Sequence, residues 1–222
     1  MSVLAIRLEG PMQSWGAQSH FQERDTAREP TKSGVIGLIC SALGRSRDQP
    51  VEDLSKLKMA IRIDREGTVM RDFQTTGDVA RASGRSTQNT VVSNRYFLSD
   101  ACFVVLLEGD EEKLNDINRA LSQPFWSLFL GRKSYLPSSP LVISRFLLSM
   151  GIDEALRKIP FQGRAEDDRS SIRVVNECSP GTGEVIADVP ISFADRNFGT
   201  RYIATSWMDG KELPLREVIE RS

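Results

Sequence analysis

The sequence is poor in histidine and cysteine, with one histidine and three cysteines in 222 residues. A single histidine, His20, allows neither a His–His acid/base pair nor an ordinary multi-histidine metal site. Cys40, Cys102 and Cys178 are far apart and form no CxxC pair. This excludes a disulfide framework and a cysteine-based zinc site, and it is typical of a reduced, cytoplasmic protein. We therefore expect no bound metal and no cofactor.

Long hydrophobic runs are also missing. No apolar stretch approaches the roughly 18 residues that span a membrane. The first residues, Met1–Leu4, fit a strand better than a signal peptide. We expect a cytoplasmic protein without a membrane partner.

The motifs of common enzymes are absent as well. Lys32 and Ser33 begin a predicted helix, but the preceding residues 25–31 contain no glycine, so the backbone cradle of a P-loop cannot form. Glu166, Asp167 and Asp168 are consecutive acids, whose side chains point in different directions and usually mark a solvated loop. The sequence predicts no catalytic residue and no enzyme.

Net charge is −1, which argues against a general nucleic-acid-binding protein. The charge is unevenly distributed, however. Residues 71–95 carry four arginines and two aspartates, whereas residues 108–116 carry five acids and one lysine. A local basic patch binds phosphates even when the whole molecule is nearly neutral. We interpret the acidic stretch as a solvated face.

Apolar periodicity predicts an α+β fold with a split βαβ, ferredoxin-like arrangement, in the order strand, helix, strand, insertion, strand, helix, strand. A helix near 153–158 and short strands among Gly and Pro turns follow. We predict a first domain over 1–145 and a small β-rich C-terminal domain over 146–222. The expected strands are 3–9, 59–64, 101–107, 125–130, 172–175, 184–189 and 201–206, and the first two helices are 33–43 and one that Asp110 caps.

The insertion contains a long polar stretch, residues 74–90, with only three apolar side chains. It cannot bury enough surface to be core. Loops of this length are usually functional or disordered. We favour a projecting β-hairpin over 71–97 with Arg81 and Arg85 near its tip, and a disordered surface loop is the alternative.

Two segments suggest a close backbone approach. Residues 10–16 hold two glycines, a proline and an exposed-looking Trp15, and residues 30–34 lead into a helix. A helix N-terminus with a lysine is a ready phosphate site, although Ser33 could equally serve only as an N-cap. Gly34, Gly37, Ser41 and Gly44 share one arc of this helix, which suits either tight sheet packing or an approaching nucleic acid.

Aromatic residues beside basic or Gly-rich turns suit RNA binding, because bases stack on such rings. These are Trp15, Phe73, Tyr96 and Tyr135.

The segments Leu8–Gly16, Pro30–Leu38, Arg71–Phe73, Leu98–Phe103 and Leu130–Ser134 resemble, in this order, the CasD family of RAMP-fold subunits of the type I-E CRISPR complex Cascade. The resemblance covers roughly residues 3–140. Two departures lie in the second Gly-rich loop, where Lys133 and Tyr135 replace an expected arginine and cysteine.

The resemblance implies a non-catalytic subunit that caps the 5′ handle of the CRISPR RNA. Its implied partners are that RNA, the repeated backbone subunit and the large PAM-reading subunit, with target DNA reached only through the complex. The alternative is a metal-independent endoribonuclease, as in a related subtype that uses a Tyr/Lys/His set. His20 and the tyrosines do not match that set. The implied RNA-binding residues are Gln13, Trp15, Gly16, Lys32, Ser33, Arg71, Arg81, Arg85, Arg95, Arg132 and Lys133.

Overall fold

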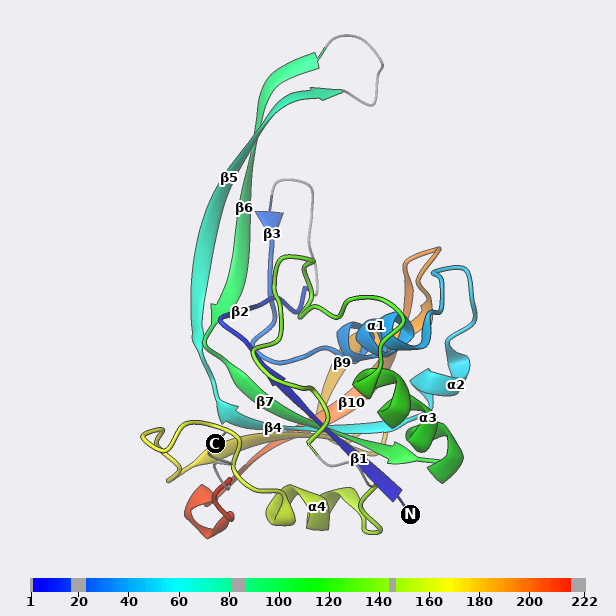
Figure 1. Ribbon diagram of the computed structural model, residues 1–222, viewed down its shortest axis with the longest axis vertical. Coiled ribbons are helices and arrows are strands. Elements are labelled where there is room, and N and C mark those ends of the chain that lie inside the picture. The colour runs from blue at the N-terminus through cyan, green and yellow to red at the C-terminus, as the bar shows by residue number, and fades with distance from the viewer. Residues whose placement is uncertain (1, 17–22, 81–86, 144–146, 217–222) are drawn as a thin grey trace.

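The computed structural model describes residues 2–16, 23–80, 87–143 and 147–216. It contains a six-stranded sheet in the order β1-β7-β4-β8-β10-β9 and a second sheet built around a long hairpin (Figure 1). The strands are β1 (Ser2–Glu9), β2 (Met12–Gln13), β3 (Glu23–Arg24), β4 (Lys58–Arg65), β5 (Thr68–Ala80), β6 (Thr87–Ser99), β7 (Cys102–Gly109), β8 (Ile172–Glu177), β9 (Glu184–Ser192) and β10 (Asn197–Met208). The helices are α1 (Lys32–Leu43), α2 (Glu52–Ser55), α3 (Glu111–Ser122), α4 (Ile152–Lys158) and a 3-10 turn (Gly210–Glu212).

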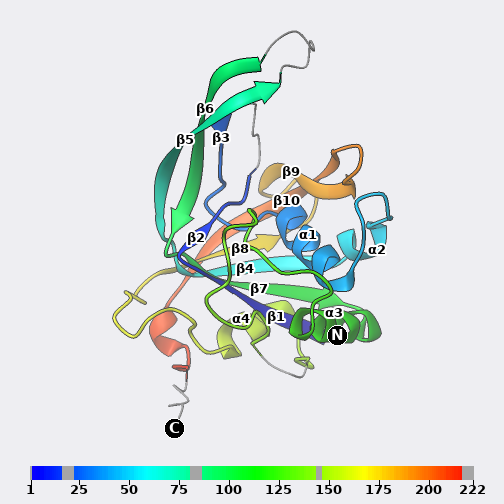
Figure 2. The ribbon, with the colours of Figure 1, turned by 45° about the horizontal axis from the view of Figure 1, so that its top comes forward.

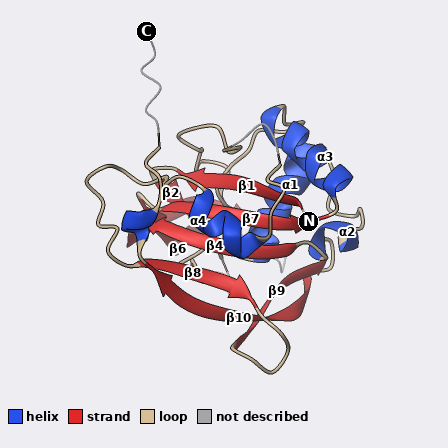
Figure 3. Ribbon diagram, turned by 90° about the horizontal axis from the view of Figure 1, so that it is seen from below, coloured by secondary structure: helices blue, strands red, loops and turns tan. Residues whose placement is uncertain are grey.

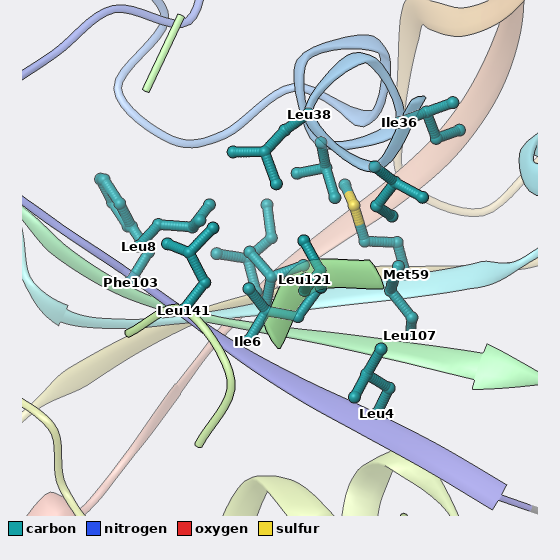
Figure 4. Close-up of a cluster of buried hydrophobic side chains, with 14 of the residues drawn as sticks. Leu4, Ile6, Leu8, Ile36, Leu38, Met59, Phe103, Leu107, Leu121 and Leu141 are labelled. Carbon is teal, nitrogen blue, oxygen red and sulfur yellow. The ribbon is translucent and has the colours of Figure 1, made fainter. Parts of the chain in front are cut away.

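The main core lies between the six-stranded sheet and the helices α1 and α3. Alternate residues of the central strands point to this face, and their neighbours point to the opposite face, which α4 covers (Figure 3). Leu38 of α1 and Leu121 of α3 pack over Ile6 and Phe103 (Figure 4). Because β7 is covered on both faces, its sequence is continuously apolar, as strands of this kind require.

The helices begin and end at recognisable caps. Thr31 is the N-cap of α1, since its Oγ1 accepts a hydrogen bond from the Gly34 N–H at 3.2 Å. Gly44 ends this helix in the left-handed region, with φ of 73°. Asp110 caps α3, as the sequence predicts. Ser33 is therefore not the N-cap.

The α+β class is confirmed, but the strand expected over residues 125–130 is wrong. The backbone there leaves the sheet because the N–H groups of Phe125 and Trp126 donate to carbonyls at the C-terminal end of α1. Residues 138–143 and 147–148 lie along the free edge of β1 instead, where the Arg7 N–H donates to the Leu141 carbonyl at 2.6 Å. Leu141 points into the main core (Figure 4).

The C-terminal strands are confirmed at their predicted places, and they extend the first sheet. β8 pairs with β4, β10 with β8, and β9 with β10, all antiparallel. β9 lies next to α1 (Figure 2). The division at residue 145 stays a prediction, and the structure joins both parts in one sheet.

The stretch predicted as a hairpin is an antiparallel pair, with register from Thr68↔Ser99 to Ala80↔Thr87. It rises well above the rest of the molecule (Figure 1). Short pairings of β6 with β2 and β3 fix its base. Arg81 and Arg85 lie outside the described residues.

Candidate nucleic-acid interface

Three segments cross at the hairpin base, and Gly131 lies where they meet. It has a φ of +91°, and a Cβ built on it would lie 1.7 Å from the carbonyl oxygen of Ser14. The Ser14 N–H donates to the Leu130 carbonyl at 3.0 Å, and its hydroxyl donates to the Tyr96 carbonyl at 3.3 Å. Only glycine fits this crossing, which joins the first glycine loop (residues 10–16) to the second glycine loop (residues 130–135).

Arg132 holds the crossing together. Its guanidinium donates to the carbonyls of Tyr96 at 2.9 Å and Arg24 at 3.2 Å, and to the Tyr135 hydroxyl at 2.9 Å. Tyr135 is buried, and Arg132 is half-buried with its guanidinium group already hydrogen-bonded within the chain. Lys133 is exposed at the same turn. Of these two adjacent cations, Arg132 therefore supports the crossing and Lys133 is accessible from solvent.

Trp15 is buried rather than exposed, so that expectation is wrong. Its side chain is 1% exposed, and its Nε1 donates to the Gln13 Oε1 at 3.3 Å. Gln13 is itself buried and donates to the Ala101 carbonyl at 2.8 Å. The ring fits because Gly34 lacks a side chain, since a Cβ there would approach the indole to 2.8 Å. Both residues shape the loop from within.

Lys32 is also buried, and the predicted phosphate site at the α1 N-terminus is already filled. Lys32 Nζ pairs with Glu177 at 2.8 Å, and the Lys32 N–H donates to the Asp188 carboxylate at 2.7 Å. Arg201 pairs with the same carboxylate at 2.6 Å. Because β9 already supplies an anion to this helix end, the Lys32 N–H and ammonium group are committed within the chain and are not free to bind a phosphate.

A cleft of about 1190 Å³ follows α1 instead. The half-buried Ser33 and the exposed Gly16 both line it. The described residues of its lining include three basic side chains and no carboxylate, and they come from the glycine loops, the α1 surface, the segment after α3, and the β9–β10 turn with the start of β10. The lining includes Gly16, Ser33, Gly37, Arg45, Arg47, Trp126, Lys133 and Phe198.

The small-residue arc of α1 divides between internal packing and the surface of the cleft. Gly34 packs against Trp15, which is tight internal packing. Gly37 and Ser41 line the cleft, and the nearest atom to a Cβ at Gly37 would be a Phe193 ring carbon at 3.7 Å. A side chain at Gly37 would therefore meet no close contact within the described part of the chain, and the approach of another backbone there stays a prediction.

The lining residues that the sequence analysis did not single out include Arg45, Arg47, Trp126 and Phe198. The signal for the first two was their position directly after Gly44, at the end of the small-residue helix. Arg45 is partly committed, because it forms a bidentate pair with Asp53 at 2.7 Å, which raises the pKa of Arg45. Burial raises the pKa of the Cys40 thiol to about 11, so the cleft holds no thiolate at neutral pH.

The hairpin separates its arginines between two faces. Arg71 is exposed on the same face as Phe73, which is 61% exposed. Arg95 lies opposite Asp72 in the register and therefore points to the other face. A strand of RNA along one face meets one of these arginines, not both. His20, like Arg81 and Arg85, lies outside the described residues.

The described part of the chain contains no group of three His, Cys, Asp or Glu side chains placed to hold a metal ion. Within the same residues, no helix is long and apolar enough to cross a membrane.

Known proteins share this architecture. Residues 3–204 match the family described as CRISPR-associated protein (Cas_Cas5). The Cascade subunit CasD of Escherichia coli strain K12 is 32% identical over 157 residues, which cover 64% of this chain and 70% of CasD.

Two solved structures are similar over nearly the whole chain. One, described as a crystal structure of a Cas protein, has a TM-score of 0.80 and 36% identity, and the match covers 97% of this chain and all 100% of that one. The other is a chain of a CRISPR RNA-guided surveillance complex, with a TM-score of 0.82, 34% identity and coverage of 94% and 90%. The resemblance found in the glycine loops is confirmed: the chain belongs to the Cas5 family of CRISPR-associated proteins, as a subunit of the CasD type.

Proposed function

We propose that the chain is a non-catalytic subunit of a type I-E Cascade complex that binds the 5′ handle of the guide RNA. In this proposal the first part of the chain is a ferredoxin-like RAMP domain and the β5–β6 hairpin is its thumb, which inserts at a kinked nucleotide. The subunit contacts the repeated backbone subunit and the large PAM-reading subunit, and it reaches target DNA only through the complex.

The observation that carries the proposal is the cleft along α1. Its walls combine a glycine-lined helix surface, three basic side chains and aromatic rings, and its lining includes no carboxylate. Single-stranded RNA binds such surfaces, because phosphates need cations and unpaired bases need flat apolar partners. Family membership supports the same conclusion.

The residues that the resemblance implies for RNA binding then form two groups. Gly16, Ser33, Lys133, Arg71 and Arg95 are accessible or half-buried, and in this proposal they contact RNA together with the tip residues Arg81 and Arg85. The other residues are buried or committed within the chain and hold the walls in place. This supporting group is Gln13, Trp15, Lys32 and Arg132.

The thumb is tested with the double variant Arg81→Ala and Arg85→Ala. We expect weaker capture of handle RNA and slower assembly with the other Cascade subunits, because two phosphate contacts are lost. Arg157→Ala with Lys158→Ala is the matched control, since it removes the same charge from α4 on the opposite face. Gel-shift and size-exclusion measurements compare the variants, and unchanged assembly by the first variant would contradict the thumb assignment.

Incubation with labelled repeat RNA tests the non-catalytic part. We expect the purified chain to leave the repeat intact in the presence and absence of EDTA. Sequence-specific cleavage that His20→Ala abolishes would replace this proposal with the metal-independent endoribonuclease.

A further inference from the structure

Two exposed aromatic residues follow α3 at the end of the cleft away from the hairpin. Phe125 is 71% exposed and Trp126 is 44% exposed. Their rings meet edge to face, with centroids 5.2 Å apart and planes at 82°. Trp126 lines the cleft, whereas Trp15 at the other end is fully buried. Of these two tryptophans, only Trp126 offers a ring to a partner.

The aromatic pair is held rigidly, although it adds nothing to the core. The Phe125 N–H donates to the Ala42 carbonyl at 2.9 Å and the Trp126 N–H donates to the Ser41 carbonyl at 3.2 Å. The Phe125 ring lies over Gly44, where a Cβ would approach it to 2.8 Å. These contacts satisfy carbonyls that a helix C-terminus otherwise leaves free. A ring fixed in this way loses little entropy when a ligand stacks on it.

Positive charge accompanies the ring. Arg45 and Arg47 follow Gly44 and line the same end of the cleft. Asp53 neutralises part of the charge of Arg45, and Lys113 also pairs with Asp53 at 2.7 Å. Arg47 is exposed and, within the described part of the chain, forms no ion pair. A cation beside an exposed ring suits a nucleotide, whose phosphate and base need these two partners.

The cleft is also long enough for a second contact. α1 has 12 residues, so it extends for about 18 Å at roughly 1.5 Å per residue. At about 3.4 Å per phosphate in a stacked strand, this distance spans roughly five nucleotides. A strand that enters at the glycine loops therefore reaches Trp126 within a few nucleotides.

We propose that Trp126 and Arg47 form a second nucleotide subsite, in which a base of single-stranded RNA stacks on the indole and Arg47 binds the adjacent phosphate. The subsite rests on the proposed function, because it extends the same cleft. The absence of carboxylates from the lining and the surplus of cations favour RNA over a protein segment as the occupant.

The test compares Trp126→Ala, Trp126→Phe and Trp207→Ala in the full-length chain. Trp207 lies on β10, is 63% exposed and does not line the cleft, so it controls for the loss of an exposed indole. The probes are fluorescent single-stranded RNAs of roughly 3, 6 and 9 nucleotides with the sequence of the 5′ end of the guide RNA, and these lengths bracket the roughly five nucleotides that the cleft spans.

We expect Trp126→Ala to weaken binding of the longer RNAs about 5- to 150-fold, which is the usual effect of losing one stacked base. Trp126→Phe should recover most of the affinity, and Trp207→Ala should match the wild type. The shortest RNA should bind the wild type and Trp126→Ala equally, because an RNA of this length bound at the glycine loops does not extend to Trp126. Arg47→Gln should show the same dependence on length.

Failure of the proposed function and failure of the subsite give different results. If the wild type binds none of the RNAs, the proposed function fails and the subsite fails with it. If the wild type binds but Trp126→Ala and Trp207→Ala bind equally well, only the subsite is overturned. If Trp126→Ala binds RNA normally but no longer assembles with the other subunits, the ring is a protein contact and the proposal is wrong. Retained thermal unfolding temperatures confirm that each variant is folded.

Discussion

Gly131 occupies a position where a side chain has no room. Its φ of +91° disfavours every L-residue, and the Ser14 carbonyl lies where a Cβ would be built. The crossing of the two glycine loops depends on this contact, since Ser14 also bonds to Leu130 and Tyr96. At the residue scale, the crossing of the two glycine loops therefore depends on the absence of a side chain at Gly131.

Gly131→Ala should therefore lower the free energy of unfolding by about 2 to 5 kcal/mol, because backbone strain and an overpacked contact add together. Gly181→Ala is the matched control. Gly181 also has a positive φ, +84°, but nothing lies within 4 Å of its would-be Cβ, so only the strain of about 1 kcal/mol applies. Urea denaturation measures both, and equal losses would show that the Ser14 contact does not matter.

The burial of Trp15 could not be predicted from its neighbours in the sequence. A tryptophan between glycines suggests an exposed ring, because the local sequence does not show which distant residues pack on it. The space beneath the ring comes from Gly34, which is distant in the sequence but adjacent in the fold. Lys32 is similar, since its partners Glu177 and Asp188 lie in the C-terminal strands. The main errors of the sequence analysis were therefore residues predicted to be accessible whose side chains instead contact distant parts of the chain.

At the scale of elements, Asp188 joins α1 to the C-terminal strands. Its carboxylate accepts from the Lys32 N–H and from Arg201, and both groups are buried. Burial lowers the pKa of Arg201, but the hydrogen bonds to Asp188 and Glu177 outweigh this and raise it overall. The cleft wall therefore depends on a contact between β9 and the beginning of α1.

Asp188→Asn should destabilise the chain by about 3 kcal/mol, because it leaves the Arg201 charge buried with fewer partners. Glu184→Gln removes an exposed carboxylate from the same strand, and its effect should stay within about 0.5 kcal/mol. Denaturation midpoints compare the two variants. A small effect of Asp188→Asn would mean that the ion network does not hold β9 against α1.

Helices and strands were predictable from the sequence where the apolar residues followed a single helical or strand periodicity. α3 shows its cap at Asp110 and its apolar face at Leu114, Ile117 and Leu121, all of which the structure confirms. The segment 125–130 was misread as a strand because an apolar run alone does not reveal that its backbone caps α1. The same run contains Trp126, so the misreading also hid part of the cleft.

At the scale of the whole molecule, the charge that matters is the local one. Net charge is −1, and yet the cleft lining contains cations without carboxylates. The acidic residues of α3 lie outside that lining. RNA binding should accordingly depend strongly on salt even though the chain as a whole is slightly acidic, because condensed counterions are released from the phosphates that the cleft contacts.

If each of the three basic residues of the cleft contacts one phosphate of single-stranded RNA, the logarithm of the association constant should fall against the logarithm of the salt concentration with a slope of about −2. Between 50 and 200 mM salt, affinity should then fall roughly 20-fold. Lys133→Ala should reduce the steepness by about 0.7, the amount for one phosphate on a single strand. Lys211→Ala removes an exposed lysine outside the cleft lining and should leave the slope unchanged. Fluorescence anisotropy titrations at four salt concentrations measure all three chains, and equal slopes for both variants would remove Lys133 from the interface.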